Sequence, residues 1–216
     1  FEDCTKLPDV ALAMRKMHRQ LGRHSNQAHA VNLGHLEKFL TAAGSELRGL
    51  RDQALLMLGY DTLRRRSELV TLRIEDIEWR ADGTGLILLR KSKTDPYGTG
   101  KYLHLSSRTC SALHNWFDAA QIDSGFILRA VFPNKSVGKE LGSGQIGRIY
   151  KRLARCTGLS DSIILKISGH SLRVGAAQDL CQAGASLPQI MVKGGWSKTD
   201  TVMRYIERTT IASPQL

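Results

Sequence analysis

The sequence predicts a mainly α fold that carries one small antiparallel β-hairpin or sheet. Most apolar residues recur at helical spacing, and residues 50–60 form a strongly apolar stretch that should be a buried helix. Two short stretches, 86–89 and 102–105, instead have the composition and length of strands. The segment 91–101 between them is polar and contains proline and glycine, so we expect a long projecting loop.

Apolar spacing and capping residues predict the other elements. Gly44 is a suitable helix stop, and Ser186 with Gln189 forms a capping-box pattern at a helix start. Thr199 or Asp200 can cap the last helix. We expect helices over 9–21, around 36–40, over 50–60 and 66–71, around 113–117, over 146–156, 171–183 and 186–193, and from 199 through Tyr205. Turns, loops or linkers are expected at 22–27, 61–62 and 136–144.

The chain is strongly basic. Its 216 residues carry a formal net charge of +11, and the pI is about 9.8. Because Lys and Arg bind phosphates with release of counterions, this excess favours a polyanionic partner. A basic surface that is merely solvated remains the alternative. The length suits one sizeable core with a short flank, and the start at Phe1 rather than Met indicates a fragment or a processed chain.

The composition disfavours several classes of protein. No apolar run approaches the roughly 20 residues that span a bilayer, and no signal-peptide pattern opens the chain, so we expect no membrane partner. The cysteines form no Cys-x-x-Cys pair, which argues against a zinc site or a disulfide framework and fits the cytoplasm. Glu75, Asp76 and Glu78 lack ligand-like partners, so we expect no metal, no cofactor and no magnesium nuclease.

The C-terminal part contains an ordered set of residues suited to metal-free phosphodiester chemistry. Such chemistry needs an in-line nucleophile, positive groups on the non-bridging oxygens, and a proton for the leaving oxygen. Tyr205 offers a phenolic nucleophile on a late helix, and His170 and Arg173 can hold a phosphate. Trp196 can form a wall and donate one N–H. Each residue alone has an ordinary explanation, such as a core tryptophan or a capping histidine, so their order carries the information.

Two arginines are candidates for the role that a metal plays elsewhere, because a planar guanidinium matches phosphate oxygens. Arg173 opens a helix, and a helix N-terminus favours anions. Arg65 can be held by Glu68, three residues later. Arg64 and Arg66 flank Arg65, so composition alone leaves the choice among these three arginines open.

Lysines of the predicted loop are candidates for protonating the leaving oxygen. Lys93 is preferred and Lys91 and Lys101 are rivals, with plain solubility as the alternative role. The basic face of the amphipathic helix 146–156 should lie near a phosphate backbone, although a solvated face is the commoner explanation for such charges. The candidate DNA-binding residues are Arg64, Arg66, Lys91, Lys101, Arg148, Lys151 and Arg152.

Taken in order, these residues resemble the tyrosine recombinase (phage integrase) family, whose pattern is Arg … Lys … His-x-x-Arg … Trp … Tyr. The resemblance rests on Gly169-His170-Ser171 with Arg173, on Gly194-Gly195-Trp196 and on Val202-Met203 with Tyr205-Ile206. It covers the chain from about Val31 to the end. It implies a catalytic domain over 31–216, preceded in 1–30 by the last helix of a DNA-clamping N-terminal domain and its linker.

The resemblance also implies a mechanism and partners. Tyr205 would attack a DNA phosphate and form a 3′-phosphotyrosyl adduct, Lys93 would protonate the leaving 5′ oxygen, and neither ATP nor metal would be required. The implied catalytic residues are Arg65, Lys93, His170, Arg173, Trp196 and Tyr205, with Glu68 supporting the pocket. The family acts as a homo-tetramer on two sites in double-stranded DNA. Without most of the clamp, this chain should bind DNA weakly and be a monomer in its absence, in a cytoplasm of bacterial, phage or plasmid context.

Two other functions remain open at this stage. A type IB topoisomerase uses related chemistry but reseals the same strand. A non-catalytic helix-turn-helix module is compatible with the helices at 171–183 and 186–193. The module leaves Arg65, Lys93 and Tyr205 without a role, so it ranks below both enzymes.

Overall fold

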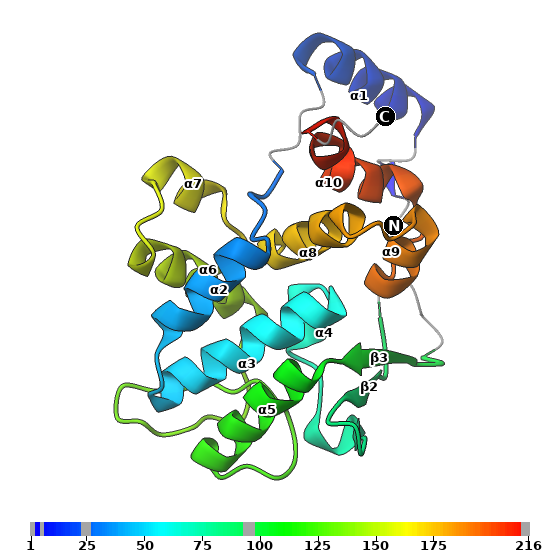
Figure 1. Ribbon diagram of the computed structural model, residues 1–216. Coiled ribbons are helices and arrows are strands. Elements are labelled where there is room, and N and C mark those ends of the chain that lie inside the picture. Colours follow the sequence, from blue (N-terminus) through cyan, green and yellow to red (C-terminus); the bar gives the residue numbers. More distant parts are fainter. Residues whose placement is uncertain (1–2, 5–6, 23–26, 93–97, 213–216) are drawn as a thin grey trace.

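The computed structural model describes residues 3–4, 7–22, 27–92 and 98–212 as a mainly helical structure with one small sheet (Figure 1). The helices are α1 (Pro8–Leu21), α2 (Leu33–Ala43), α3 (Leu47–Thr62), α4 (Arg66–Leu69), α5 (Ser107–Ala120), α6 (Ser143–Cys156), α7 (Asp161–Lys166), α8 (Ser171–Gln182), α9 (Leu187–Gly194) and α10 (Thr199–Ala212), with a 3₁₀ turn η2 (Ile74–Asp76). The predicted fold class is confirmed. Within the described ranges, no helix has the length and apolar character of a membrane span.

The sheet contains β1 (Ile77–Trp79), β2 (Gly85–Leu89) and β3 (Lys101–Leu105) in the antiparallel order β1-β2-β3. The predicted hairpin is therefore confirmed, and in its register Ile87 pairs with Leu103. The prediction missed β1, which pairs Ile77 with Ile87 on the other side of β2. Because β1 has only three residues, it is too short to show the alternation of apolar and polar residues that marks a strand.

The main core surrounds α3, which packs against α5, α2 and α8. The strongly apolar stretch predicted as a buried helix forms α3, and Leu55, Leu56 and Leu58 are fully buried there. Trp116 of α5 is also fully buried, and its indole N–H donates to the carbonyl of Ile127 at 2.8 Å. Burying each such side chain stabilises the fold by about 1.5–3 kcal/mol, so α3 is a rigid platform for the segments that follow it.

A second, smaller apolar cluster joins α8, α9 and α10, which lie together in Figure 1. Ala176 and Ala177 of α8 meet Ile190 of α9 and Val202 of α10. The small alanine side chains let the three helices approach one another. This cluster holds the start of α8, which follows His170, close to the turn that contains Trp196 and to the helix that contains Tyr205.

Some predicted boundaries were wrong. Asp61 and Thr62 end α3 instead of forming a turn, and the chain reverses at Leu63, which has a left-handed backbone with φ of 52°. Ser143 and Gly144 begin α6 although they were expected in a loop. The helix α7 was not predicted at all, because six residues hold too little periodicity.

The segment before α2 is fastened to α8. The backbone N–H of Val31 donates to the carbonyl of Ser171 at 3.0 Å, and Val31 is fully buried. The Asp179 carboxylate accepts hydrogen bonds from the Leu33 N–H at 2.7 Å and from the Tyr60 hydroxyl at 2.6 Å. By contrast, α1 has no buried residue. A compact unit that begins near Val31 is compatible with these contacts, and the domain boundary stays a prediction.

Gly175 allows the contact between this segment and α8. A Cβ on Gly175 would lie 2.0 Å from the Val31 carbonyl oxygen, so backbone would have to move to accommodate it. We expect Gly175→Ala to lower the free energy of unfolding by about 1–3 kcal/mol, as overpacking does. The measurement is urea unfolding followed by circular dichroism. The matched control is Gly144→Ala in α6, where a Cβ meets nothing within 4 Å and alanine should leave stability equal or higher. Equal destabilisation by both changes would contradict the steric explanation.

Candidate active site

The predicted catalytic residues that the structure describes gather around one cavity of about 190 Å³. Its lining residues come from the turn after α3, from α8, from the turn after α9 and from α10. They are Arg65, His170, Arg173, Trp196, Ser197, Lys198, Thr201 and Tyr205. Lys93, the candidate acid, lies outside the described residues. Tertiary contacts thus bring Arg65 to residues more than a hundred positions later in the sequence.

Arg173 is the most buried cation of this cavity, with 3% of its surface exposed. One guanidinium nitrogen donates to the carbonyl of Leu63, and the guanidinium carbon lies 4.0 Å from the centre of the Trp196 ring. Nη2 has no hydrogen-bond acceptor among the residues that the structure describes. Burial, then Arg65 and Arg64, lower the pKa of Arg173 to about 9, so the side chain remains charged at neutral pH. A buried cationic donor without an acceptor favours an anion in the cavity.

Arg65 is held by Glu68, as its position three residues earlier predicts. The guanidinium lies 2.8 Å from one carboxylate oxygen of Glu68, and the other oxygen accepts from the Arg65 backbone N–H at 3.1 Å. In both contacts Arg65 donates, and the Glu68 carboxylate accepts at the start of α4. Burial raises the pKa of Glu68, but the hydrogen bonds from Arg65 outweigh burial and lower it below its ordinary value. The charged carboxylate therefore orients Arg65 toward the cavity.

His170 lies directly before α8, is exposed to solvent and lines the cavity. Its backbone N–H donates to the Ser168 hydroxyl at 3.2 Å, which fixes the turn that leads into α8. Burial of the ring, then the positive charges of Arg173, Arg66 and Arg65, lower the pKa of His170 below 6.5. The imidazole is therefore neutral at pH 7 and can accept a proton.

Trp196 and Tyr205 form the other side of the cavity. Their ring centres are 5.9 Å apart with an interplanar angle of 59°. Gly195 has a left-handed backbone, and a Cβ on Gly194 would lie 1.8 Å from the Trp196 ring, so both glycines are required for this turn. The side-chain amide of Gln178 donates to the Tyr205 carbonyl at 2.8 Å, which ties α10 to α8.

Arg64 requires a correction, because it was predicted to contact DNA. Only 3% of Arg64 is exposed, and its guanidinium donates to the carbonyls of Thr62 and Lys193. The side chain fills the space between the turn after α3 and the end of α9, so it does not reach a partner outside the protein. The ambiguity among the three consecutive arginines is thereby reduced, since Arg65 lines the cavity and Arg66 is exposed.

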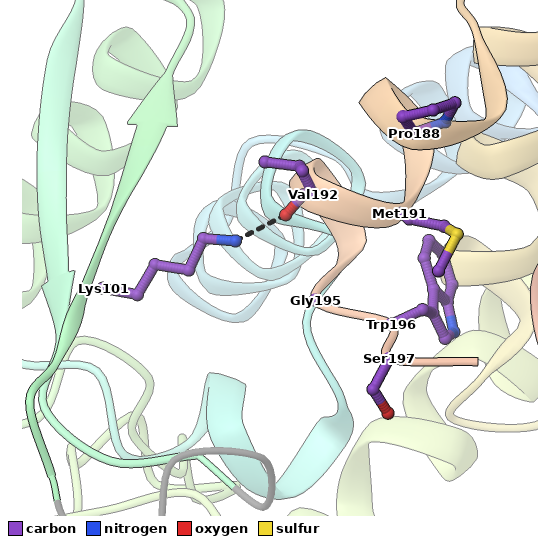
Figure 2. A pocket seen from close by; sticks show the side chains of 7 residues that line it. All are labelled: Lys101, Pro188, Met191, Val192, Gly195, Trp196 and Ser197. Carbon is purple, nitrogen blue, oxygen red and sulfur yellow. Dashed lines mark hydrogen bonds between the residues drawn. The ribbon is translucent and has the colours of Figure 1, made fainter. Parts of the chain in front are cut away.

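The other candidate DNA-binding residues have different surroundings. Lys101 turns inward and donates to the carbonyl of Val192 (Figure 2). Arg152 pairs with the fully buried carboxylate of Asp52, and Lys151 donates to the Leu165 carbonyl at 3.3 Å. Exposed side chains are found at Arg66, Lys91 and Arg148. Contact with DNA stays a prediction for all of these residues.

Ser197, Lys198 and Thr201 also line the cavity and were not identified from the sequence. The available signal was their position between Trp196 and the helix of Tyr205, because a short connector between two site residues must border the same site. Among the residues that the structure describes, no group of three His, Cys, Asp or Glu side chains lies together as metal ligands would. The positive side chains that line this cavity are Arg65, Arg173 and Lys198.

Comparison with known proteins finds relatives over most of the chain. The profile of the phage integrase family matches residues 32–210. The chain is similar to recombinase Cre of Escherichia phage P1, with 29% identity over 213 residues that cover 91% of this chain and 62% of Cre. It is also similar to an integrase/recombinase XerD homolog of Selenomonas ruminantium, with 33% identity over 173 residues that cover 77% of this chain and 50% of the relative. The chain thus spans between half and two thirds of the length of these relatives.

Solved structures share the fold. XerA recombinase superposes with a TM-score of 0.66 at 18% identity, over 96% of this chain and 75% of that chain. One chain from the crystal structure of a lambda integrase tetramer bound to a Holliday junction superposes with a TM-score of 0.62 at 17% identity. The match covers 96% of this chain and 59% of that chain. The match to the family profile covers far more than half of the sequence. The chain therefore belongs to the phage integrase family.

Proposed function

We propose that this chain is the catalytic part of a site-specific DNA recombinase that cleaves and rejoins strands through a covalent 3′-phosphotyrosyl intermediate on Tyr205. The observation that carries the proposal is the buried Arg173 guanidinium, whose Nη2 lacks an acceptor among the described residues, in a cavity that Tyr205 also lines. A phosphate diester supplies the oxygen acceptors that this nitrogen lacks. Tyr205 lines the same cavity, so a phosphate bound there lies beside this side chain.

The proposed step is a substitution at phosphorus. The Tyr205 phenolic oxygen forms a bond to phosphorus, the bond to the 5′ oxygen breaks, and the phenolic proton passes to the neutral His170 ring or to water. Arg65 and Arg173 stabilise the charge that develops on the non-bridging oxygens. Lys93 donates a proton to the leaving 5′ oxygen. Because the adduct retains the bond energy, attack by a 5′ hydroxyl of the partner strand restores a phosphodiester without ATP.

Relatives support the choice of substrate and assembly. Cre is named a recombinase, and the lambda integrase structure holds a tetramer on a Holliday junction. By analogy, double-stranded DNA is the proposed substrate, and a homo-tetramer on two sites is the proposed active form of the longer protein. Residues 31–216 would be the catalytic domain, and residues 1–30 the end of a DNA-clamping domain with its linker. The proposed place of action is the bacterial cytoplasm.

The test is trapping of the covalent adduct with nicked duplexes that lose a short 5′-hydroxyl piece after cleavage. The duplexes are drawn from the sequences that flank the encoding gene, and the reaction contains EDTA. A slow-migrating, protease-sensitive adduct with mass-spectrometric attachment at Tyr205 is expected. DNA binding without any adduct would instead support a non-catalytic helix-turn-helix module. Relaxation of supercoiled plasmid without strand exchange between two sites would support the topoisomerase alternative.

The rate of cleavage should depend on pH through His170. Because the pKa of His170 is lowered below 6.5, the ring is neutral above that value and can accept the tyrosine proton. Single-turnover cleavage should therefore be flat from about pH 8 to about pH 6.5 and fall as protonation of His170 proceeds at lower pH. The same shift lowers the free energy of unfolding below pH 6.5, because the unfolded chain then binds a proton at His170 more readily than the folded chain. In His170→Gln the remaining activity should lack this acidic fall, and an unchanged pH profile would exclude His170 as the proton acceptor.

A further inference from the structure

Two basic side chains from distant parts of the chain meet at the carbonyl end of α9. Lys101, the first residue of β3, donates through its ammonium to the carbonyl of Val192, as Figure 2 shows. Arg64, in the turn after α3, donates through its guanidinium to the next carbonyl, that of Lys193. The donors lie 91 and 129 positions from their acceptors along the sequence. Three separate segments of the fold are therefore joined at this point.

Helix geometry explains why this end of α9 attracts cations. The last carbonyls of an α-helix have no partner within the helix, and they carry the negative end of its dipole. The helix has only eight residues and is followed at once by Gly195 and Trp196. Positive groups on its last carbonyls therefore stabilise both the helix end and the turn that follows.

The turn to Trp196 follows directly from this helix end. The Trp196 backbone N–H donates to the carbonyl of Met191 at 3.0 Å. A Cβ on Gly195 would lie 2.7 Å from Nη1 of Arg64, so the guanidinium packs against the backbone of the turn. Displacement of Arg64 or of the last carbonyls of α9 would consequently displace the Trp196 backbone.

Trp196 and the residue after it border two separate pockets. Trp196 and Ser197 line both the cavity that contains Tyr205 and a second, mostly apolar cavity of about 400 Å³ between β3 and α9. Lys101, Pro188 and Met191 line the second cavity, as Figure 2 shows. The indole itself is 8% exposed and packs in the apolar cluster of α8, α9 and α10. The anchored turn sets where the indole enters this cluster, and with it the contact with the Arg173 guanidinium at 4.0 Å.

We propose that Lys101 and Arg64 are positioning residues, which fix the Trp196 turn by binding the carbonyl end of α9 and thereby hold Arg173 in its stacked position. Burial, and then the charge of Arg64, lower the pKa of Lys101, as expected for an ammonium that is turned into the protein. The consequence for DNA cleavage rests on the proposed function above. The consequence for Trp196 does not, because it concerns the protein alone.

The first experiment observes Trp196 directly by proton–nitrogen NMR of the indole N–H groups, with its signal assigned through Trp196→Phe. Lys101→Met should shift the Trp196 signal, whereas the signal of Trp116, which is bonded to Ile127 in the core, should stay in place. Lys101→Arg, which retains a donor, should restore most of the original position. The matched control is Lys135→Met, since Lys135 is exposed and pairs only weakly with Glu46 at 3.4 Å. A Trp196 signal that is equally unchanged in both methionine variants would overturn the proposal.

The second experiment separates positioning from direct contact with DNA. In single-turnover cleavage we expect Lys101→Met to be roughly tenfold slower, with the rate recovered in Lys101→Arg. DNA affinity should change less than about twofold, and the slope of affinity against salt should not change, because Lys101 binds a protein carbonyl. A slope smaller by about one unit would show that Lys101 contacts a phosphate and would overturn the proposal. Failure of the unmodified protein to form any adduct would count against the proposed function only, since the NMR result stands without catalysis.

Arg64→Leu provides an independent variant. It removes the donor to the Lys193 carbonyl and should also shift the Trp196 signal. The double variant Arg64→Leu with Lys101→Met should shift the Trp196 signal by an amount that differs from the sum of the two single-variant shifts. The reason is that both side chains bind the same helix end. If Arg64→Leu does not fold, the comparison of Lys101→Met with Lys101→Arg and Lys135→Met decides the question by itself.

Discussion

Tyr205→Phe is expected to eliminate the covalent adduct and to lower DNA cleavage by roughly 10⁴-fold or more, because it removes the only atom that forms the new bond to phosphorus. The hydroxyl is the sole change, and the phenyl ring can keep its contact with Trp196 at 5.9 Å between ring centres. The free energy of unfolding should therefore change by less than about 0.5 kcal/mol, as for substitutions that leave packing intact. Adduct formation on nicked duplexes, DNA affinity and urea unfolding are the three measurements.

Tyr102→Phe is the matched control for this experiment. Tyr102 lies on β3, away from the cavity, with 53% of its surface exposed. Its substitution should leave adduct formation within about twofold of the unmodified protein. Retention of the adduct in Tyr205→Phe would show that another residue is the nucleophile. Loss of DNA affinity together with the adduct would indicate that Tyr205 has a binding role instead.

Arg173→Lys is expected to slow cleavage by roughly 10²–10³-fold, the range found when one donor to a developing oxyanion is removed. Lysine keeps the positive charge but lacks the planar fork, in which one nitrogen binds the Leu63 carbonyl while another remains for a phosphate oxygen. The stacking of the guanidinium on Trp196 at 4.0 Å is also lost. Stability should fall by about 1–3 kcal/mol, because the Leu63 carbonyl loses its buried charged partner.

A surface arginine separates this effect from a general loss of arginine. Arg108 is exposed and pairs with Glu37 at 2.7 Å, so Arg108→Lys should leave the cleavage rate within about twofold. Rates are compared under single-turnover conditions at saturating DNA, where binding does not limit the result. Equal rates for Arg173→Lys and the unmodified protein would mean that Arg173 acts only through its charge, and the bidentate role would be wrong.

Sequence reasoning succeeded where contacts are local. The ion pair of Arg65 with Glu68 joins residues three positions apart, so helical spacing alone predicts it. The capping box of Ser186 with Gln189 is of the same kind and is confirmed at the start of α9. The apolar spacing of residues 50–60 likewise predicted the buried helix at the centre of the fold. In each case the determining interactions lie within one turn of one helix.

Sequence reasoning could not show which basic side chains bind groups inside the protein. Arg64, Lys101 and Arg152 were predicted to contact DNA; Arg64 is buried, whereas contact with DNA stays a prediction for Lys101 and Arg152. Their acceptors are the carbonyls of Lys193 and Val192 and the buried carboxylate of Asp52. The sequence around each basic residue does not predict its acceptor, because the acceptor lies about a hundred positions away along the chain.

The sequence by itself determined the mainly helical fold, most helix positions, and the ordered set of Arg65, His170, Arg173, Trp196 and Tyr205 that identifies the family. These features depend on residue spacing, which is written along the chain. Only the tertiary structure decided which of three consecutive arginines lines the cavity and which supports α9 from within. It also made Trp196 a lining residue of two pockets and lowered the pKa of His170. The physical reason is that burial and charge–charge contacts depend on distances in space, which form only when α3, β3, α8 and α9 pack together.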